Sequence, residues 1–515
     1  MRQIIVIEYI INLLVLLIYH MHMFQLNSYF YKKHLLWIKN NYTKIIVQLL
    51  AIILPTLLLA FDNNIVSVIA ILLLTFSILY NLPKKKAKIA FKITNRVKRM
   101  FITESILIFL LFITNNNGNF IFIKLCILNI ISPVMALIVN FLNSPIEYLG
   151  KKYYINQAKK ILNDMPNLIV IGITGSYGKT SVKNFLAKTL SSKYEVLITP
   201  QNYNTTMGVV KTIRENLKPI HQIFICEMGA TNIGDIKEIC DIVKPKIGII
   251  TSIGPQHLES FKTIDNIIKT KLELANSVQE NNGTIFLNYN NEYLAKQDIK
   301  GNIFSYGVND KSLNYNSYNL NSSSKGLSFT LLDKNSNKEI EFKTKLIGKH
   351  NVINLTGAVS IANYLGIPLN KLVHSVREIK SVEHRLQLVS HSNLTILDDS
   401  YNSNPISSKS ALDTLAEFEG TKIIVTPGLI ELGDDEIKYN FEFGQYMTNI
   451  CDYIFLVKSK SAKAILDGIN STSFNKDKIF NVNTPQEAID CISKMNINGK
   501  ITVLLENDLP DNYNI

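Results

Sequence analysis

Hydrophobic positions form long uninterrupted runs in the first 142 residues and short, regularly spaced runs after about residue 150. A helix needs about 20 apolar residues to cross the hydrocarbon core of a bilayer. The first part of the chain therefore predicts about five membrane-spanning helices separated by short polar loops. The candidate spans are residues 3–20, 45–61, 65–82, 100–114 and 120–142. The fourth of these is short, which leaves four or five spans open.

Basic residues are concentrated between these apolar runs. Residues 1–150 contain 14 Lys/Arg and 4 Asp/Glu, a net charge of +10, whereas the rest of the chain contains 40 and 37, a net of +3. This distribution is typical of membrane topology and does not indicate nucleic-acid binding. The loops 21–44 and 83–99 are basic, and those at Asp62–Asn64 and Asn115–Asn119 are not. The positive-inside rule predicts a multi-pass protein of the cytoplasmic membrane, with its N-terminus outside and everything after about residue 143 in the cytoplasm.

The chain after residue 150 alternates apolar, strand-like runs with helical patterns, which favours parallel sheets with helices on both faces. The first series of predicted strands is Leu168–Ile173, Glu195–Ile198, Ile223–Cys226, Ile247–Ile250 and Thr284–Leu287. A polar stretch at 308–340 predicts a loop or hairpin excursion. The second series is Leu394–Leu397, Lys422–Val425, Tyr453–Val457 and Ile501–Leu505. We predict a transmembrane region at 1–145, a central α/β domain at 146–375 and a Rossmann-like α/β domain at 376–515.

A glycine-containing turn follows the first predicted strand directly and leads into a predicted helix. Its residues are Thr174, Gly175, Ser176, Tyr177, Gly178, Lys179, Thr180 and Ser181. Glycines let backbone amides close around phosphate oxygens, and the start of a helix adds partial positive charge. Lys179 is suited to the β and γ phosphates, and the Thr180 hydroxyl to Mg²⁺. The GxxGK[ST] spacing is shorter than the full phosphate-loop pattern, so an ordinary turn between strand and helix stays open from this segment alone.

Three further side chains are candidates for metal binding. Glu227 ends the strand Ile223–Cys226, where a carboxylate would suit Mg²⁺ near the phosphates. His257 follows the next strand, and Lys271 lies on a predicted helix. Taken alone, His257 equally suits a hydrogen-bonded structural residue and Lys271 a solvated helical lysine.

Seven motifs occur in a fixed order: TGSYGKTS, QNYNTTMG, ICEMGA, TSIGPQHLESF, TKLEL, LIGKHNVIN and LDDSYNSNP. Together they resemble the Mur ligase family over about residues 150–515, and most of all the members that add D-alanyl-D-alanine to a UDP-muramoyl tripeptide. The resemblance implies a phosphate-loop central domain and an ATP-dependent acid–amino-acid ligase that forms carbon–nitrogen bonds. The carboxylate of a peptidoglycan or other cell-envelope precursor would be activated as an acyl phosphate, and the amine of an amino acid or dipeptide would then displace phosphate.

The resemblance also implies roles for individual residues. Thr180 and Glu227 would bind a first Mg²⁺, and His257 and a carbamylated Lys271 a second. Arg385 would act in catalysis with Lys179, Lys271 and His257. The implied nucleotide contacts are the loop Thr174–Ser181, Asn288, His350, Asn351, Asn354, Arg385 and Asp399, and the last motif extends to Tyr401 and Asn404.

The resemblance has limits at both ends of the chain. Ordinary members have an N-terminal globular domain that binds the UDP part of the substrate, whereas apolar segments stand here. The segment Thr426–Gly433 differs from the sequence that usually precedes Glu-Leu-Gly in the family. Asn440 lies near the position where members commonly have a histidine. The segment Leu504–Asp511 occupies the place of the usual Lys-Gly-Ser segment. The expected partners are ATP, a UDP- or lipid-linked carboxylate, an amine and the lipid bilayer. Two alternatives stay open: a membrane-anchored poly-γ-glutamate-type polyamide synthetase and a catalytically inactive membrane scaffold.

Overall fold

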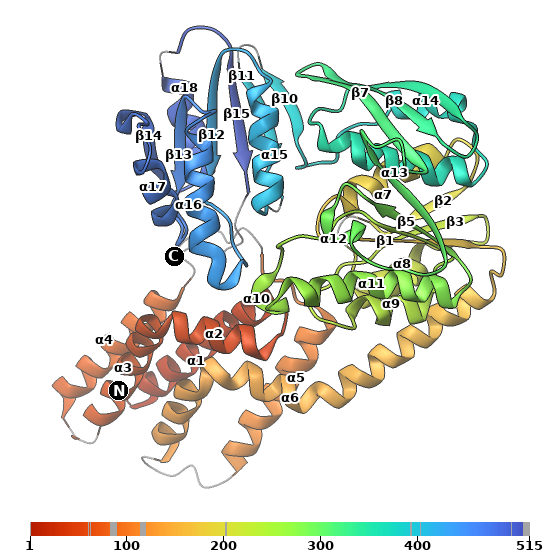
Figure 1. Ribbon diagram of the computed structural model, residues 1–515. Helices are drawn as coiled ribbons and strands as arrows, with labels where there is room; N and C mark the ends of the chain where they lie inside the picture. The colour runs from red at the N-terminus through yellow and green to blue at the C-terminus, as the bar shows by residue number, and fades with distance from the viewer. Residues whose placement is uncertain are drawn as a thin grey trace. The chain divides into compact units, whose positions relative to one another are not determined.

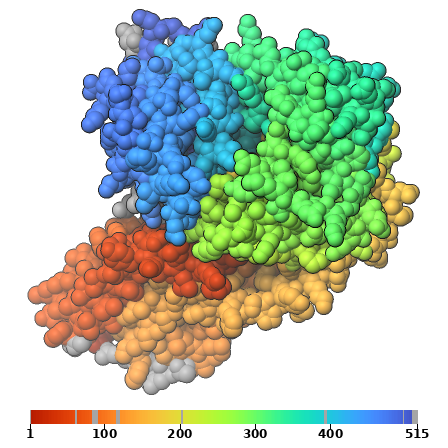
Figure 2. Space-filling view, viewed as in Figure 1, coloured from red at the N-terminus to blue at the C-terminus, as the bar shows by residue number. Residues whose placement is uncertain are grey.

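The computed structural model describes residues 2–59, 61, 63–82, 90–113, 120–200, 203–391, 394–401, 403–495 and 497–507. The chain forms two compact units, with the boundary between Lys152 and Tyr153 (Figure 1). Figure 2 shows the first unit in red and orange and the second from yellow to blue. Several features named from the sequence lie outside the described residues: Asp62, Lys84–Lys88, Asn115–Asn119, Gln201, Asn202, Asn402 and the segment from Asp508.

The first unit is helical. Its helices are α1 (Arg2–Leu26), α2 (Tyr31–Asn40), α3 (Tyr42–Leu58), α4 (Asn64–Asn81), α5 (Asn95–Ile113) and α6 (Phe120–Asn163). Among the described residues, α1, α4 and α6 are long and apolar enough to cross a membrane, and α2 with α3 makes a fourth span only if their 77° bend lies within one span. The predicted span at 100–114 is not among them, because α5 begins with Arg96, Lys98 and Arg99 and also contains Glu104.

Polar side chains in the interior connect the helices of this first unit. Asn12 donates to Asn129 over 3.1 Å and accepts from Ser77 over 3.0 Å. Gln48 donates to Asn81 over 2.6 Å. Large apolar side chains on the same helices are exposed, for example Ile7, Leu14, Leu72 and Phe141. An apolar exterior around hydrogen-bonded polar groups is the arrangement that helices adopt in lipid.

Helix α6 continues for 44 residues, past the predicted domain boundary at residue 145. Pro145 lies within it and does not end it. The last turns belong to the second unit, where Ile155, Ala158 and Leu162 pack into the core on one side of the first sheet. The predicted change from apolar region to α/β domain therefore falls inside one continuous helix.

The first sheet of the second unit has the strand order β2-β3-β1-β4-β5-β6-β7-β8-β9. The strands are β1 (Ile169–Thr174), β2 (Val196–Ile198), β3 (Ile223–Glu227), β4 (Ile247–Ile250), β5 (Thr284–Asn288), β6 (Asn302–Val308), β7 (Tyr315–Ser323), β8 (Gly326–Asp333) and β9 (Lys338–Thr344). Pairing is parallel from β2 to β7 and antiparallel from β7 to β9. The polar stretch at 308–340 is thus a hairpin excursion that extends the sheet.

Helices cover both faces of this sheet, as predicted (Figure 1). Alternate residues of β1 face opposite cores: Ile171 and Ile173 pack with α7 (Lys179–Leu190), α13 (His350–Tyr364) and α14 (Leu369–Arg377). Val170 packs with the other group of helices. That group is α8 (Thr206–Asn216), α9 (Asp235–Val243) and α11 (Ile264–Glu280), and the short helices α10 (Leu258–Phe261) and α12 (Glu292–Ala295) complete the domain.

The second sheet has the order β10-β11-β15-β12-β13-β14 and is parallel except for the β10–β11 pair. Its strands are β10 (Gln387–His391), β11 (Leu394–Asp399), β12 (Thr421–Thr426), β13 (Tyr453–Val457), β14 (Ile479–Val482) and β15 (Ile501–Glu506). Its helices are α15 (Pro405–Ala416), α16 (Glu436–Met447), α17 (Ala462–Asn470) and α18 (Pro485–Lys494), with short 3-10 turns at Gly433–Asp435 and Lys476–Lys478. In both sheets the parallel strands bring their carboxyl ends to one edge, where polar side chains gather.

Candidate functional site

The glycine-containing loop connects β1 to α7 and is hydrogen-bonded to the segment that follows β4. The backbone amides of Ser176 and Tyr177 donate to the Ser252 carbonyl and hydroxyl over 2.7 and 2.9 Å. Gly178 has a left-handed backbone, φ 78°, which favours glycine. A Cβ there would lie 2.6 Å from Asn354 Oδ1, and at Gly175 it would lie 2.1 Å from Thr251 Oγ1. Both positions therefore require glycine, and the loop leads into the start of α7, whose backbone amides suit a phosphate group.

Lys179 is the first residue of α7, and its side chain folds back over the loop. Its Nζ donates to the carbonyls of Gly175 and Ser176 over 2.6 and 3.0 Å. Burial lowers the pKa of Lys179 to about 8; Glu227 opposes this shift and the nearby Arg385 adds to it. An ammonium group that is poorly hydrated and close to another cation is stabilised by an incoming anion.

Glu227 ends β3 beside this loop, as the sequence predicted, and is buried. Its Oε1 accepts from Thr180 Oγ1 over 3.1 Å and from Asn204 Nδ2 over 3.2 Å. Its Oε2 lies 2.9 Å from the Nζ of Lys183, which is also buried. The Thr180 hydroxyl and the Glu227 carboxylate thus adjoin each other, which suits a Mg²⁺ ion that prefers oxygen ligands.

Sequence reasoning did not single out Lys183 or Asn204. Lys183 lies one helical turn after Lys179, on a side of α7 where Val182 and Leu186 are fully buried. The position of Lys183 among the apolar core positions of the helix could have predicted a buried ion pair, because lysine is almost never buried unless it is paired. Asn204 lies within the motif QNYNTTMG, but only the fold brings it to Glu227.

Replacing Lys183 by methionine is expected to destabilise the α/β unit by about 3–5 kcal/mol, because a carboxylate would remain in the core without its cation. Methionine has a similar volume, so packing is largely kept. The measurement is the thermal unfolding midpoint of the full chain in detergent, with the exposed Lys188→Met on the same helix as the control. Equal midpoints for the two variants would show that the Lys183–Glu227 pair does not hold this region together.

Lys271 lies on α11 with only 3% of its surface exposed. Its Nζ is 5.9 Å from the centre of the Phe261 ring. Burial lowers the pKa of Lys271 to about 7, and the charge of Lys179 lowers it further, against Glu273 and Asp235. Lys271 is therefore not a solvated helical lysine, and at neutral pH a large fraction of its amine is uncharged.

His257 precedes α10 and contacts the C-terminal domain. Its backbone is left-handed, φ 53°, and its Nδ1 lies 2.5 Å from Glu431 Oε2. Helix α10 (Leu258–Phe261) follows His257 directly and ends at Phe261, whose ring lies beside Lys271. Among the described residues no three His, Cys, Asp or Glu side chains come together as a metal site.

Four of the six residues implied in nucleotide contacts outside the loop belong to the central domain, and their surroundings differ. Asn354 lies against Gly178, and its amide donates to Asn351 over 3.4 Å. His350 hydrogen-bonds Ser410 of α15 over 2.8 Å, and burial lowers the pKa of His350 to about 4, so it is neutral. Asn288 donates to the Thr251 carbonyl over 2.8 Å. Asn354 thus adjoins the loop, whereas His350 joins the central domain to the C-terminal one.

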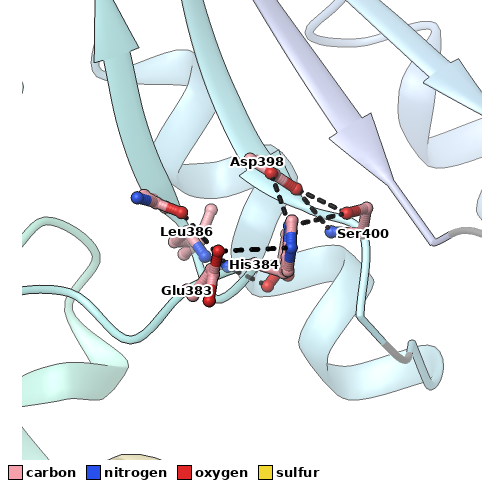
Figure 3. A network of polar contacts seen from close by, with 7 residues as sticks. Glu383, His384, Leu386, Asp398 and Ser400 are labelled. Carbon is pink, nitrogen blue, oxygen red and sulfur yellow. Dashed lines mark hydrogen bonds and ion pairs between the residues drawn. The ribbon is translucent and has the colours of Figure 1, made fainter.

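A polar network at the start of the C-terminal domain joins His384, Asp398 and Ser400 (Figure 3). His384 Nδ1 donates to Asp398 over 2.7 Å, and the Ser400 hydroxyl donates to the same carboxylate over 2.6 Å. Arg385, Asp399 and Tyr401 each follow one residue of this network in the sequence and form a second cluster. The Arg385 guanidinium lies 4.5 Å from the centre of the Tyr401 ring. Arg385 is also the main cation that opposes the raised pKa of Asp399.

Asp399 and Glu506 end neighbouring strands in register and are both buried. Burial raises the pKa of Asp399 to about 6, and burial together with Asp399 raises the pKa of Glu506 well above its usual value. Two adjacent carboxyl groups in a core disfavour each other's ionised form, which adds to the effect of burial on both pKa values. Glu506 stands in the C-terminal segment whose sequence differs from the usual Lys-Gly-Ser. Asn404 does not join this cluster through its side chain, which caps α15.

Comparisons with known proteins agree with this architecture. The chain matches the family models for the Mur ligase middle domain at residues 173–362 and for the Mur ligase, glutamate ligase domain at residues 384–505. The UDP-N-acetylmuramoyl-tripeptide–D-alanyl-D-alanine ligase of Haemophilus influenzae is 28% identical over 68% of this chain and 76% of its own length. That of Bacillus subtilis is 28% identical over 63% of this chain and 70% of its own length.

Solved structures of the same type share the fold. MurF from Acinetobacter baumannii superposes with a TM-score of 0.63 at 26% identity, covering 70% of this chain and 77% of its own. The MurF ligase from Thermotoga maritima in complex with ADP has a TM-score of 0.62 at 22% identity, covering 69% and 80%. The α/β unit thus has the fold of these enzymes.

Proposed function

Because the chain belongs to the Mur ligase family, we propose that it is the ligase that joins D-alanyl-D-alanine, or a similar amino acid or dipeptide, to a peptidoglycan precursor. It is an ATP-dependent ligase that forms an amide bond between a carboxylate and an amine. The observation that carries the proposal is the arrangement of Lys179, Thr180 and Glu227 around a glycine loop that fits phosphate.

The reaction has two steps. A carboxylate oxygen of the acceptor attacks the γ-phosphorus of ATP, which forms an acyl phosphate and releases ADP. The amine then attacks the acyl carbon, loses a proton and expels inorganic phosphate. Lys179 neutralises charge on the transferred phosphoryl group, and the backbone amides of the loop bind the other phosphates of ATP. Arg385 and Asp399 come from the C-terminal domain, so the proposed site is complete only when both domains contribute.

Two Mg²⁺ ions fit the donors of the site. Thr180 and Glu227 would hold one, and His257 with a carbamylated Lys271 the other. When bound, Mg²⁺ supplies positive charge to the phosphate oxygens. A carbamate forms when an uncharged amine attacks CO₂ and loses a proton. With a pKa of about 7, about half of the Lys271 amine is uncharged at pH 7, against about 0.03% for an ordinary lysine.

We also propose that the first unit spans the membrane and holds the catalytic domains on the cytoplasmic side. The support is the three apolar helices, their exposed apolar side chains and their hydrogen-bonded interior. Four basic residues lie between the candidate spans α1 and α4, on helices and not in the loop that the sequence predicted: Lys32, Lys33 and Lys39 on α2 and Lys44 on α3. Their charge supports this orientation. An acceptor in the plane of the membrane would then be lipid-linked, whereas a UDP-linked acceptor would arrive from the cytoplasm.

An assay of the full chain in phospholipid nanodiscs tests the proposal. Phosphate release is expected only when ATP, Mg²⁺, D-alanyl-D-alanine and an acceptor are all present. The acceptors to compare are UDP-muramoyl tripeptide and its lipid-linked counterpart, and mass spectrometry should find one added dipeptide. A ladder of products would identify a polyamide synthetase instead. If no acceptor–amine pair stimulates turnover, the cell-envelope assignment is wrong.

A further inference from the structure

The contact between His257 and Glu431 joins two domains at the candidate cation site. His257 belongs to the segment after β4 of the central domain, and Glu431 to the segment after β12 of the C-terminal domain. Their side chains meet at 2.5 Å, and the Glu431 carbonyl accepts from the Glu259 amide over 3.3 Å. The segment after β12 therefore contacts the start of α10 through both its side chain and its backbone.

The backbone at this contact is unusual on both sides. His257 has φ 53° and Glu431 has φ 62°, in the left-handed region that residues other than glycine seldom occupy. Such conformations persist where the surrounding structure holds them in place, and they are concentrated at functional sites. Both side chains are about one quarter exposed. A single hydrogen bond contributes about 0.5–1.5 kcal/mol to stability, whereas a left-handed backbone costs about 1–3 kcal/mol at each such residue.

The chemistry of the pair determines which nitrogen of His257 is available. An ionised carboxylate only accepts hydrogen bonds, so His257 Nδ1 carries the proton in the contact with Glu431. Nε2 is then the ring nitrogen that is left to bind a cation. A histidine that binds a metal through one nitrogen generally donates from the other to a carboxylate or carbonyl, which fixes the ring and its tautomer. Glu431 is placed to do this for His257.

We propose that Glu431 is a positioning residue that orients His257 toward a divalent cation and thereby couples cation binding to the approach of the C-terminal domain. The proposal rests on the assignment of His257 as a cation ligand in the proposed function. Glu431 reaches His257 only when the two domains are in contact. Cation binding should therefore stabilise the domain contact, and the domain contact should strengthen cation binding.

Binding of Mn²⁺, used as a paramagnetic substitute for Mg²⁺, measures the effect without any turnover. The full chain in detergent is titrated with Mn²⁺ in the presence of ADP and bicarbonate, and free Mn²⁺ is measured by electron paramagnetic resonance. Glu431→Gln is expected to raise the Mn²⁺ dissociation constant by about 10- to 100-fold. Asp434→Asn, an exposed acid three residues away, is the matched control and should leave it unchanged.

The variant His257→Ala separates this inference from the proposed function. If His257→Ala and Glu431→Gln both weaken Mn²⁺ binding while Asp434→Asn does not, the inference is supported. If His257→Ala weakens binding and Glu431→Gln binds as wild type does, Glu431 only joins the domains and the inference is overturned. If His257→Ala itself binds as wild type does, the cation assignment in the proposed function is wrong and the inference is lost with it.

A distance measurement tests the coupling between domains directly. Cys491 on α18 is exposed, whereas Cys126, Cys226, Cys240 and Cys451 are buried, so it is a natural labelling site in the C-terminal domain. A second spin label on Lys269→Cys in α11 reports on the central domain. Mg²⁺ with ADP is expected to narrow the distribution of distances between the two spin labels in the labelled protein that keeps Glu431. The same addition should not narrow the distribution in the labelled Glu431→Gln variant. Equal narrowing in both would overturn the coupling.

Discussion

Replacing Lys179 by alanine is expected to lower kcat for phosphate release by about a thousandfold, with a smaller effect on ATP binding. A single charged donor at a site of developing charge contributes on the order of 10²–10³ in kcat, and Lys179 is the cation nearest the phosphate loop carbonyls. Its low pKa shows that it is poorly solvated, which strengthens its interaction with an anion. The loop amides remain in the variant, so some affinity for ATP remains as well.

The measurement is phosphate release in a single turnover with saturating ATP, acceptor and amine. Lys188→Ala is the matched control, because Lys188 lies on the same helix and is exposed. Circular dichroism verifies that both variants fold. A Lys179→Ala enzyme that keeps kcat within about threefold of wild type would remove Lys179 from the chemistry and would make the loop a binding element only.

Most of the strands that the sequence predicted are buried on both faces, whereas β2 and β11, which were also predicted, are only partly buried. Runs such as Ile223–Cys226 and Ile247–Ile250 consist of apolar, mostly β-branched residues, because a central parallel strand contacts helices above and below. Strands at the sheet edges carry polar side chains on one face and lack this signal. The strands β7, β8 and β9 were anticipated only as a polar excursion, and β6, β10 and β14 were not predicted.

The candidate site was predictable where chemistry follows directly from position along a strand or loop. Glu227 ends a strand beside the phosphate loop, so its approach to Thr180 follows from parallel topology. The contacts of Lys183 with Glu227 and of Glu431 with His257 join residues 44 and 174 positions apart. Nothing in local pattern specifies such pairs, because they depend on helix packing and on the arrangement of two domains.

The apolar N-terminal region illustrates a different limit. Hydropathy identified every helix longer than 16 residues in the first unit, but not which of them are suited to cross a membrane. Helix α5 has a basic first turn before its apolar part, so the apolar part stays as short as the predicted span 100–114. Buried hydrogen-bonded pairs such as Asn12 and Asn129 could not be predicted either, because an asparagine in an apolar run gives no indication of its partner.

Replacing Lys271 by alanine is expected to lower kcat by at least about a hundredfold, the effect typical of losing a metal ligand or its support. A carbamate carries a negative charge that an alanine cannot provide. A small carboxylate such as acetate, which can enter the space left by the side chain, should restore part of the activity. The exposed Lys269→Ala on the same helix is the matched control and should behave as wild type with or without acetate.

The pH dependence of CO₂ activation distinguishes a carbamate from a simple buried cation. Burial places the pKa of Lys271 at about 7, so the ammonium form, which cannot add CO₂, dominates below that pH and the amine above it. Bicarbonate should therefore stimulate wild-type enzyme at pH 8 and progressively less as the pH falls through 7. It should not stimulate Lys271→Ala at any pH, because no amine remains to react. Full activity of Lys271→Ala without acetate would rule out the carbamate, and Lys271 would then be a buried amine whose role is only to fill the core between α11 and the Phe261 ring.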